Sequence, residues 1–125
     1  MREKEKQVKD EAIKSKCEAL AKDRFGEETV VSWSNANKGL FYLPIINDDD
    51  EIEKLGILKP IDRNILSFAS TKINDAGLYA FLEACMRECW IAGDNCILDE
   101  DEYFIPAANT FNKILEGKKA SLLKR

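Results

Sequence analysis

The sequence predicts one α+β domain, in which a long N-terminal helix precedes a small antiparallel sheet and a C-terminal group of three helices. Two observations predict this fold. Apolar residues recur at helical spacing near the N-terminus and through the second half of the chain, whereas β-branched and aromatic residues cluster between these regions. The expected parts are a helix over residues 1–26, a sheet over 29–59, a helical part over 62–117 and a basic tail over 118–125.

The first predicted helix is rich in Lys, Glu and Ala, which are good helix formers. We expect it to run from Glu3 to Arg24, because Gly26 follows at a position where glycine commonly ends a helix. Its apolar side chains recur on one face, which makes the helix amphipathic. The residues of that face are Val8, Ala12, Ile13, Cys17, Leu20 and Ala21.

Two runs that favour β-strands follow, TVVSWS from Thr29 and LFYLPII from Leu40. The linker between them, NANKG, is typical of a hairpin, so the sequence predicts that the two runs pair. Pro44 favours an edge position for the second strand. The segment from Ile52 to Lys59 is a candidate third strand, in which Gly56 either weakens the strand or marks a bulge.

The stretch LGILKPIDRNILSFAS, which begins at Leu55, predicts a sharp corner between a strand and a helix. Pro60 cannot donate a hydrogen bond, and it forces Lys59 into an extended conformation that ends the strand. Asp62 is the expected N-cap of the helix. Ile61 and Leu66 have the spacing of a hydrophobic staple, which would set the angle between strand and helix.

The helix after the corner is expected to end at Asn74, where Asp75 can cap a second helix. The second helix is expected to end at Gly93, with Glu83 and Arg87 paired on its outer face. Helical spacing also predicts which side chains face inward. They are Ile65, Leu66, Ala69 and Ile73 in the first helix, and Leu78, Phe81, Leu82, Cys85, Cys89 and Ala92 in the second.

The last predicted helix has Asp99 as its cap, Glu102 closing a capping box and Gly117 as its end. Pro106 interrupts this pattern. It lies too deep for a first-turn proline if the helix starts at Glu100, so the sequence predicts either a kink at Pro106 or two short helices.

The charge distribution bears on partners and location. The net charge of −4 disfavours general binding to phosphate backbones, although the basic C-terminal tail leaves nucleic-acid contact open as an alternative function. No apolar run is long enough for a membrane span. The N-terminal residues lack the apolar core of a signal peptide, and their carboxylates differ from a transit peptide. These features lead us to expect a cytoplasmic protein with no membrane partner.

Enzyme signatures are sparse in this sequence. The chain has no histidine, which is the commonest acid–base group and the commonest metal ligand, and it has no glycine-rich phosphate loop. We therefore expect no catalytic residue, metal or cofactor, with a carboxylate-based enzyme as the remaining catalytic alternative. The acidic residues 48–51 lack the spacing of a calcium-binding loop and predict a solvated turn.

The cysteines and tryptophans are expected mainly in the core. Without histidine, a metal site would need all four thiolates or the help of carboxylates, and Cys85 and Cys89 instead share one helix face. A redox role for Cys17 or Cys96 stays open. Trp33 and Trp90 can serve as core residues or as interface anchors, and partial burial is expected of Trp90.

Three segments, ILKPIDRNILSFAS, ECWIAGD and DEDEYFIPAANTFNKIL, together resemble a family of small phage and prophage tail assembly chaperone-like proteins. In that family a Lys-Pro-Arg type corner and two helices precede a Cys-Trp/Phe-x-Gly-Gly-Asp type turn. The resemblance covers about the C-terminal half of this chain. The residues that match the corner are Lys59, Pro60 and Arg63, and those that match the turn are Cys89, Trp90, Gly93 and Asp94.

Two positions depart from the family pattern. Ile61 separates Pro60 from Asp62, whereas the family places the proline next to the Asp-Arg pair, and Ala92 stands where a first glycine is common. The first departure concerns the geometry of the corner. The second concerns the conformation of the turn.

The resemblance implies a non-enzymatic protein that binds tail proteins transiently during assembly, either the tape-measure protein or the tail tube. The candidate partner-interface residues are Lys59, Pro60, Arg63, Trp90, Gly93 and Asp94. Arg63 lies in a first helical turn, where the helix dipole disfavours a cation, so we expect a carboxylate partner either within the fold or on another protein. The exposed face of the first helix and the sheet edge also permit self-association.

Overall fold

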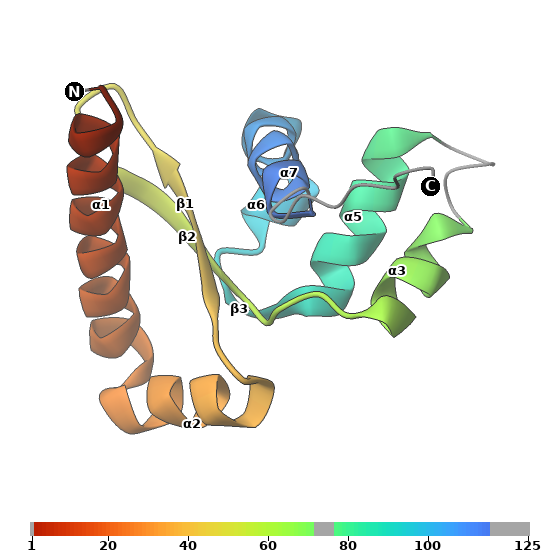
Figure 1. Cartoon of the computed structure of the whole chain (residues 1–125), viewed down its shortest axis with the longest axis horizontal. Helices are drawn as coiled ribbons and strands as arrows, with labels where there is room; N and C mark the ends of the chain where they lie inside the picture. Colours follow the sequence, from red (N-terminus) through yellow and green to blue (C-terminus); the bar gives the residue numbers. More distant parts are fainter. Residues whose placement is uncertain (1, 72–76, 116–125) are drawn as a thin grey trace, which may run out of the picture.

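The computed structural model describes residues 2–71 and 77–115, and these form helices on both faces of a central sheet (Figure 1). Helix α1 (Arg2–Phe25) lies along one face, and α2 (Glu27–Asn37) crosses the end of the sheet. The other face carries α3 (Arg63–Ser70), α5 (Leu78–Cys89), α6 (Cys96–Asp99) and α7 (Asp101–Leu115). The predicted α+β class and the N-terminal helix are confirmed. None of the described helices is long and apolar enough to cross a bilayer.

The sheet consists of β1 (Phe41–Ile46), β2 (Ile52–Leu58) and β3 (Trp90–Gly93) in that order, and neighbouring strands are antiparallel. Each pairing shifts once, between Ile45 and Ile46 in β1 and between Ile57 and Leu58 in β2. Because β1 is an edge strand, the predicted edge position of Pro44 is confirmed.

The predicted hairpin between residues 29–34 and the following strand is wrong, because 29–34 lie in α2. Glu27 and Glu28 in the first turn favour the helix through its dipole. The apparent hairpin linker is the end of this helix: Lys38 has a φ of 59°, and Gly39 donates a backbone hydrogen bond to Ser34. The actual hairpin joins β1 to β2 through the acidic turn.

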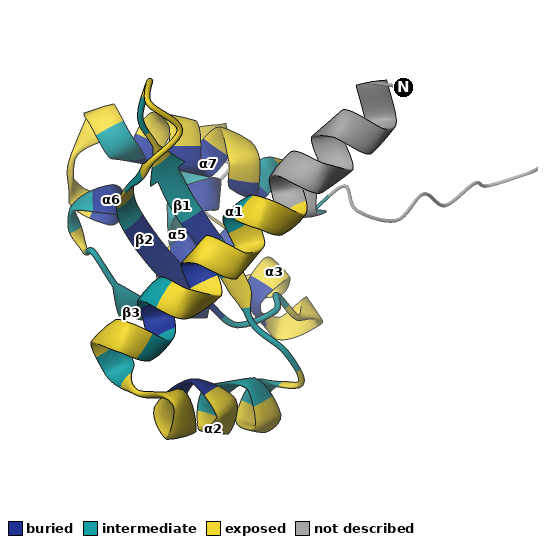
Figure 2. Ribbon diagram, turned by 90° about the vertical axis from the view of Figure 1, so that its left-hand side faces the viewer, coloured by how far each residue is buried: buried dark blue, intermediate teal, exposed yellow. Residues whose placement is uncertain are grey.

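The sheet separates two clusters of buried side chains. β2 contributes Leu58 to the larger cluster and Leu55 and Ile57 to the smaller one, and its second half is dark blue in Figure 2. The other buried members of the smaller cluster are Cys17, Ala21 and Val30. The other buried members of the larger cluster are Leu43, Ile65, Ala69, Leu82, Cys85, Met86, Cys89, Ile97, Leu98, Phe104, Ala107, Ala108 and Phe111.

The predicted corner after β2 is confirmed in part. The Asp62 carboxylate accepts a hydrogen bond from the Ile65 amide at 2.9 Å and so caps α3. Of the predicted inner face, Ile65 and Ala69 are buried, but Leu66 is 37% exposed, so its predicted burial is wrong. α3 ends at Ser70, earlier than predicted, because Thr71 already forms a turn. Ile73, Asn74 and Asp75 lie outside the described residues.

The second predicted helix is shorter than expected, because α5 ends at Cys89 and residues 90–93 form β3. Trp90 is extended and Gly93 has a φ of 127°, which no helix contains. Leu82, Cys85 and Cys89 are buried as predicted, together with Met86. Leu78 is 52% exposed, which corrects the prediction that it faces inward.

The last predicted helix is a single helix, α7, which continues through Pro106, so the predicted alternative of two short helices is wrong. Asp99 is the final residue of α6 and does not cap α7 as predicted. The Glu100 carbonyl instead accepts hydrogen bonds from the amides of Tyr103 and Phe104 at the start of α7. Pro106 lies inside α7. Gly117 and the tail 118–125 are outside the described part of the chain.

Candidate functional site

The two family-like motifs meet at one junction of the fold. The Lys59 amide donates a hydrogen bond to the Cys89 carbonyl at 2.8 Å, and Leu58 pairs with Trp90 across β2 and β3. The corner after β2 and the turn after α5 are therefore neighbours in space. The predicted site residues fall into two groups there, one outward-facing and one bound into the fold.

Gly93 and Asp94 belong to the inner group. A Cβ atom on Gly93 would collide with the Leu55 carbonyl oxygen, so only glycine fits at this position. The Asp94 amide donates to the Leu55 carbonyl at 2.8 Å, and the Asp94 carboxylate accepts from the Leu55 amide at 2.8 Å. Asp94 thus completes the hydrogen bonding of Leu55, whose side chain is fully buried.

Asp94 also binds α1. Its carboxylate accepts two hydrogen bonds from the guanidinium of Arg24, at 3.2 and 3.3 Å. This contact joins the C-terminal end of α1 to the end of β3. Sequence reasoning missed Arg24, because a basic residue in the last turn of a helix is common and nothing local indicates a partner so distant in sequence.

Trp90 holds the junction together from the side of β3. Its six-membered ring covers Gly56, where an added Cβ would lie 2.6 Å from Trp90 Cη2. Gly56 therefore marks close packing of a side chain on the strand, whereas the β2 irregularity lies at Ile57 and Leu58. Trp90 is half-buried, as predicted, and its buried indole N–H has no acceptor among the described residues.

The outer group consists of Lys59, Pro60 and Arg63. Lys59 and Pro60 are half-buried, whereas Arg63 is exposed. In the described part of the chain Arg63 forms no ion pair, so the structure provides no internal carboxylate partner for it. Arg63 is the predicted interface residue that the fold leaves most available to another molecule.

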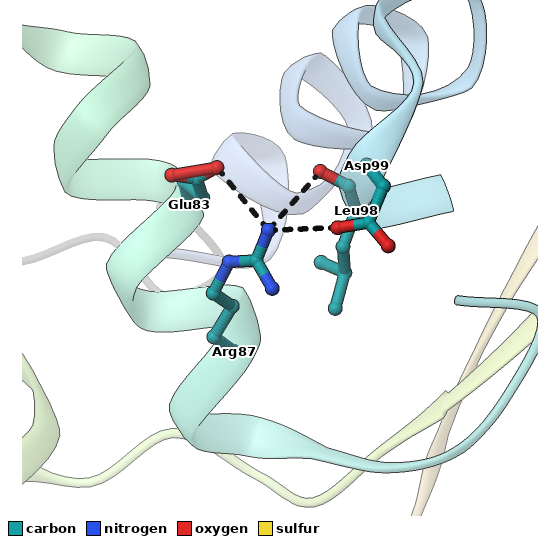
Figure 3. A network of polar contacts seen from close by, with 4 residues as sticks. All are labelled: Glu83, Arg87, Leu98 and Asp99. Carbon is teal, nitrogen blue, oxygen red and sulfur yellow. Dashed lines mark hydrogen bonds and ion pairs between the residues drawn. The ribbon is translucent and has the colours of Figure 1, made fainter. Parts of the chain in front are cut away.

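A second polar network joins the last turns of α5 to α6. Figure 3 shows Arg87 between Glu83, Asp99 and the Leu98 carbonyl. The Arg87 Nη2 atom lies 3.5 Å from Glu83, 3.1 Å from Asp99 and 3.5 Å from the Leu98 carbonyl oxygen. The hydrogen bond to Asp99 and the charges of both carboxylates raise the pKa of Arg87. The predicted Glu83–Arg87 pair is confirmed, and Asp99 serves as its third member.

Three of the four thiols are buried away from any reactant. Cys17, Cys85 and Cys89 are buried and Cys96 is half-buried. Burial raises the pKa of Cys17 and that of Cys89 from 9.0 to about 11, so both thiols stay protonated at neutral pH. Residues 2–71 and 77–115 contain no group of three or more side chains arranged to hold a metal ion.

The acidic turn between β1 and β2 is organised by Asn47. Its side-chain oxygen accepts hydrogen bonds from the Asp49 and Glu51 amides at 3.0 Å each, and Asp50 has a φ of 60°. These contacts account for a tight turn, while the side chains at 48–51 are exposed.

No known family model matches this chain, and neither the curated proteins nor the solved structures include a significant match.

Proposed function

We propose that the chain is a non-enzymatic protein-binding module that assists phage tail assembly by binding a tail component, above all the tape-measure protein. The resemblance of its two motifs to tail assembly chaperone-like proteins supports this function. Their proximity adds to that support, since the Lys59–Cys89 hydrogen bond makes the corner and the turn neighbours in space.

The observation that carries the proposal is the position of Arg63. Arg24 and Arg87 are both ion-paired, whereas Arg63 is exposed without an ion pair in the described residues. A cation in the first turn of α3 opposes the helix dipole and so adds nothing to the stability of the helix. An arginine there is better explained by a carboxylate on a partner, to which its planar guanidinium can bind in bidentate geometry.

Isothermal titration calorimetry of the purified chain with the tape-measure protein of the same phage genome tests this function. Arg63→Ala is expected to weaken binding about tenfold, and Arg63→Lys to weaken it less. Arg87→Ala is the matched control, because it removes the same charge from another exposed arginine and is expected to leave the affinity unchanged.

Thermal unfolding of both alanine variants separates binding from folding. Arg87→Ala is expected to lose stability, because it breaks the network with Glu83 and Asp99, whereas Arg63→Ala is not. A destabilised Arg63→Ala protein that binds normally would make Arg63 structural. Failure of the wild-type chain to bind the tape-measure or tail-tube protein would reject the proposed function.

A further inference from the structure

The free side of β1 is an unusual edge for a soluble protein. β1 pairs with β2 alone, and no described strand covers its other side. Its sequence, FYLPII, contains no charged residue, and Phe41 and Ile46 are 40% and 38% exposed. Apolar edge strands readily pair with another chain, and proteins usually protect them with charges, prolines or irregular pairing. Here the protection is limited to Pro44 and the shift between Ile45 and Ile46.

Space beside this edge is open on both of its faces. A hollow of about 510 Å³ lies towards α1, where Ile13 and Lys14 line it together with β1. A second hollow of about 390 Å³ lies towards α7, lined by Tyr103 and Pro106. Thr110 of α7 lines both hollows. An added strand would therefore lie in a groove between α1 and α7.

The charges around the groove differ between the two ends of β1. The Ile46 end continues into Asp48, Asp49, Asp50 and Glu51, and Glu53 and Glu102 line the hollow beside it. Lys54, which lies 6.0 Å from the Tyr103 ring centre, offsets part of this charge. The Phe41 end follows the exposed Lys38, and Lys59 lines a small hollow beside Phe41. Lys14 lines the hollow on the α1 side, which extends along β1 from Phe41 to Ile46.

The opposite charges at the two ends of β1 favour a second copy of the same strand as the occupant of the groove. A second copy of β1 in antiparallel orientation brings the basic end of each strand to the acidic end of the other, whereas parallel pairing would bring like charges together. An antiparallel pair of identical strands also has the two-fold symmetry of a closed dimer, in which both copies use the same surface. We propose that two copies of this chain associate through β1 in antiparallel orientation and so join their sheets into one.

Pro44 makes this association modest in strength. It can accept a hydrogen bond but cannot donate one, so the pair of strands forms fewer hydrogen bonds than a regular ladder. Salt is expected to weaken the dimer, because complementary charges at exposed positions are screened. The dimer should therefore dissociate on dilution and in high salt.

Sedimentation equilibrium of the full chain tests the proposal, with variants in which the charges of two exposed residues are reversed. The wild type is expected to approach twice its mass of 14.2 kDa as concentration rises. Lys38→Glu and Asp49→Lys should each weaken the dimer about tenfold, because each brings like charges together at both ends of the interface. The double variant should restore the affinity, and a mixture of the two single variants should form heterodimers in preference to homodimers.

Circular dichroism checks that each variant keeps the wild-type fold. A wild-type chain that stays monomeric at all concentrations would overturn the proposal. So would a dimer that neither single substitution weakens, because the copies would then meet on another surface. Amide protection of β1 that appears only when a tail protein is added to a monomer would assign the edge to a foreign strand and would equally overturn it.

Discussion

Arg24 and Asp94 lie 70 positions apart in the sequence and form a two-point ion pair that joins α1 to the end of β3. The same Asp94 carboxylate accepts the Leu55 amide at 2.8 Å. One aspartate therefore connects the first helix, the central strand and the edge strand β3. The side chains are partly exposed, 34% for Arg24 and 26% for Asp94, so the ion pair itself contributes little, about 1 kcal/mol or less.

The hydrogen bond to Leu55 is expected to matter more than the ion pair. Asp94→Ala should lower the free energy of unfolding by about 1–3 kcal/mol, because it leaves a backbone amide in the core without its acceptor. Arg24→Ala should cost less than about 1 kcal/mol. Asp94→Asn keeps an oxygen for the Leu55 amide and should resemble Arg24→Ala. Urea unfolding measures all three, and an Arg24→Ala loss as large as that of Asp94→Ala would contradict the assignment.

Substitutions at Gly93 and Gly39 test how closely β3 approaches β2, with Gly39 as the control. Their φ angles are 127° and 126°, but an added Cβ would meet the Leu55 carbonyl at Gly93 and no atom within 4 Å at Gly39. Gly39→Ala should cost about 1–3 kcal/mol through backbone strain alone. Gly93→Ala should cost a further amount of about 1–3 kcal/mol, because Leu55 must move. Equal losses in urea unfolding would show that β3 can shift freely.

The cap of α3 can be tested with two substitutions, of which one keeps the size of the side chain. Asp62→Ala removes the acceptor of the Ile65 amide and should destabilise the protein by about 1 kcal/mol. Asp62→Asn preserves an N-cap oxygen and should be close to neutral. Thermal unfolding compares the two variants, and an asparagine variant as unstable as the alanine variant would show that the charge, and not the cap, stabilises this corner.

The buried thiols predict a loss of stability in alkaline solution. Burial raises the pKa of Cys17 and Cys89 from 9.0 to about 11, so between these values the unfolded chain loses thiol protons that the folded chain keeps. Their contribution to stability is complete below pH 9.0 and is lost as the pH rises to about 11. Urea unfolding across this range should give a falling free energy, with a shallower fall in Cys17→Ala and Cys89→Ala variants. An unchanged slope would exclude these thiols as the cause.

The sequence predicted correctly those features of the fold that depend on residues close together in the chain. The long first helix, the Asp62 cap and the inner face at Leu82, Cys85 and Cys89 follow from spacing and capping rules, and all are confirmed. The strand prediction at 29–34 failed because β propensity is weak. The glutamates at the start of α2 and the left-handed end at Lys38 outweighed it.

The junction that holds the candidate site could not be predicted, because it depends on residues far apart in sequence. Trp90 and Ile91 continue the helical pattern of the preceding residues. They form a strand only because they pair with the side of β2 that β1 leaves free. Arg24 has no local feature that indicates Asp94. Conversely, the place of Arg63 in the first turn of α3 followed from the corner, because an N-cap at Asp62 makes the next residue the first of the helix.

Because the sheet divides the interior into two clusters, this small protein can unfold partly as well as completely. Among the residues whose burial the structure describes, α1 and α2 supply Cys17, Ala21 and Val30 to the smaller cluster and none to the larger one. Local unfolding that detaches α1 and α2 from the sheet therefore leaves the larger cluster intact. Such partial unfolding requires less free energy than complete unfolding. Amide protons of α1 should consequently exchange with solvent sooner than those of α5, and a protease should meet the N-terminal layer first.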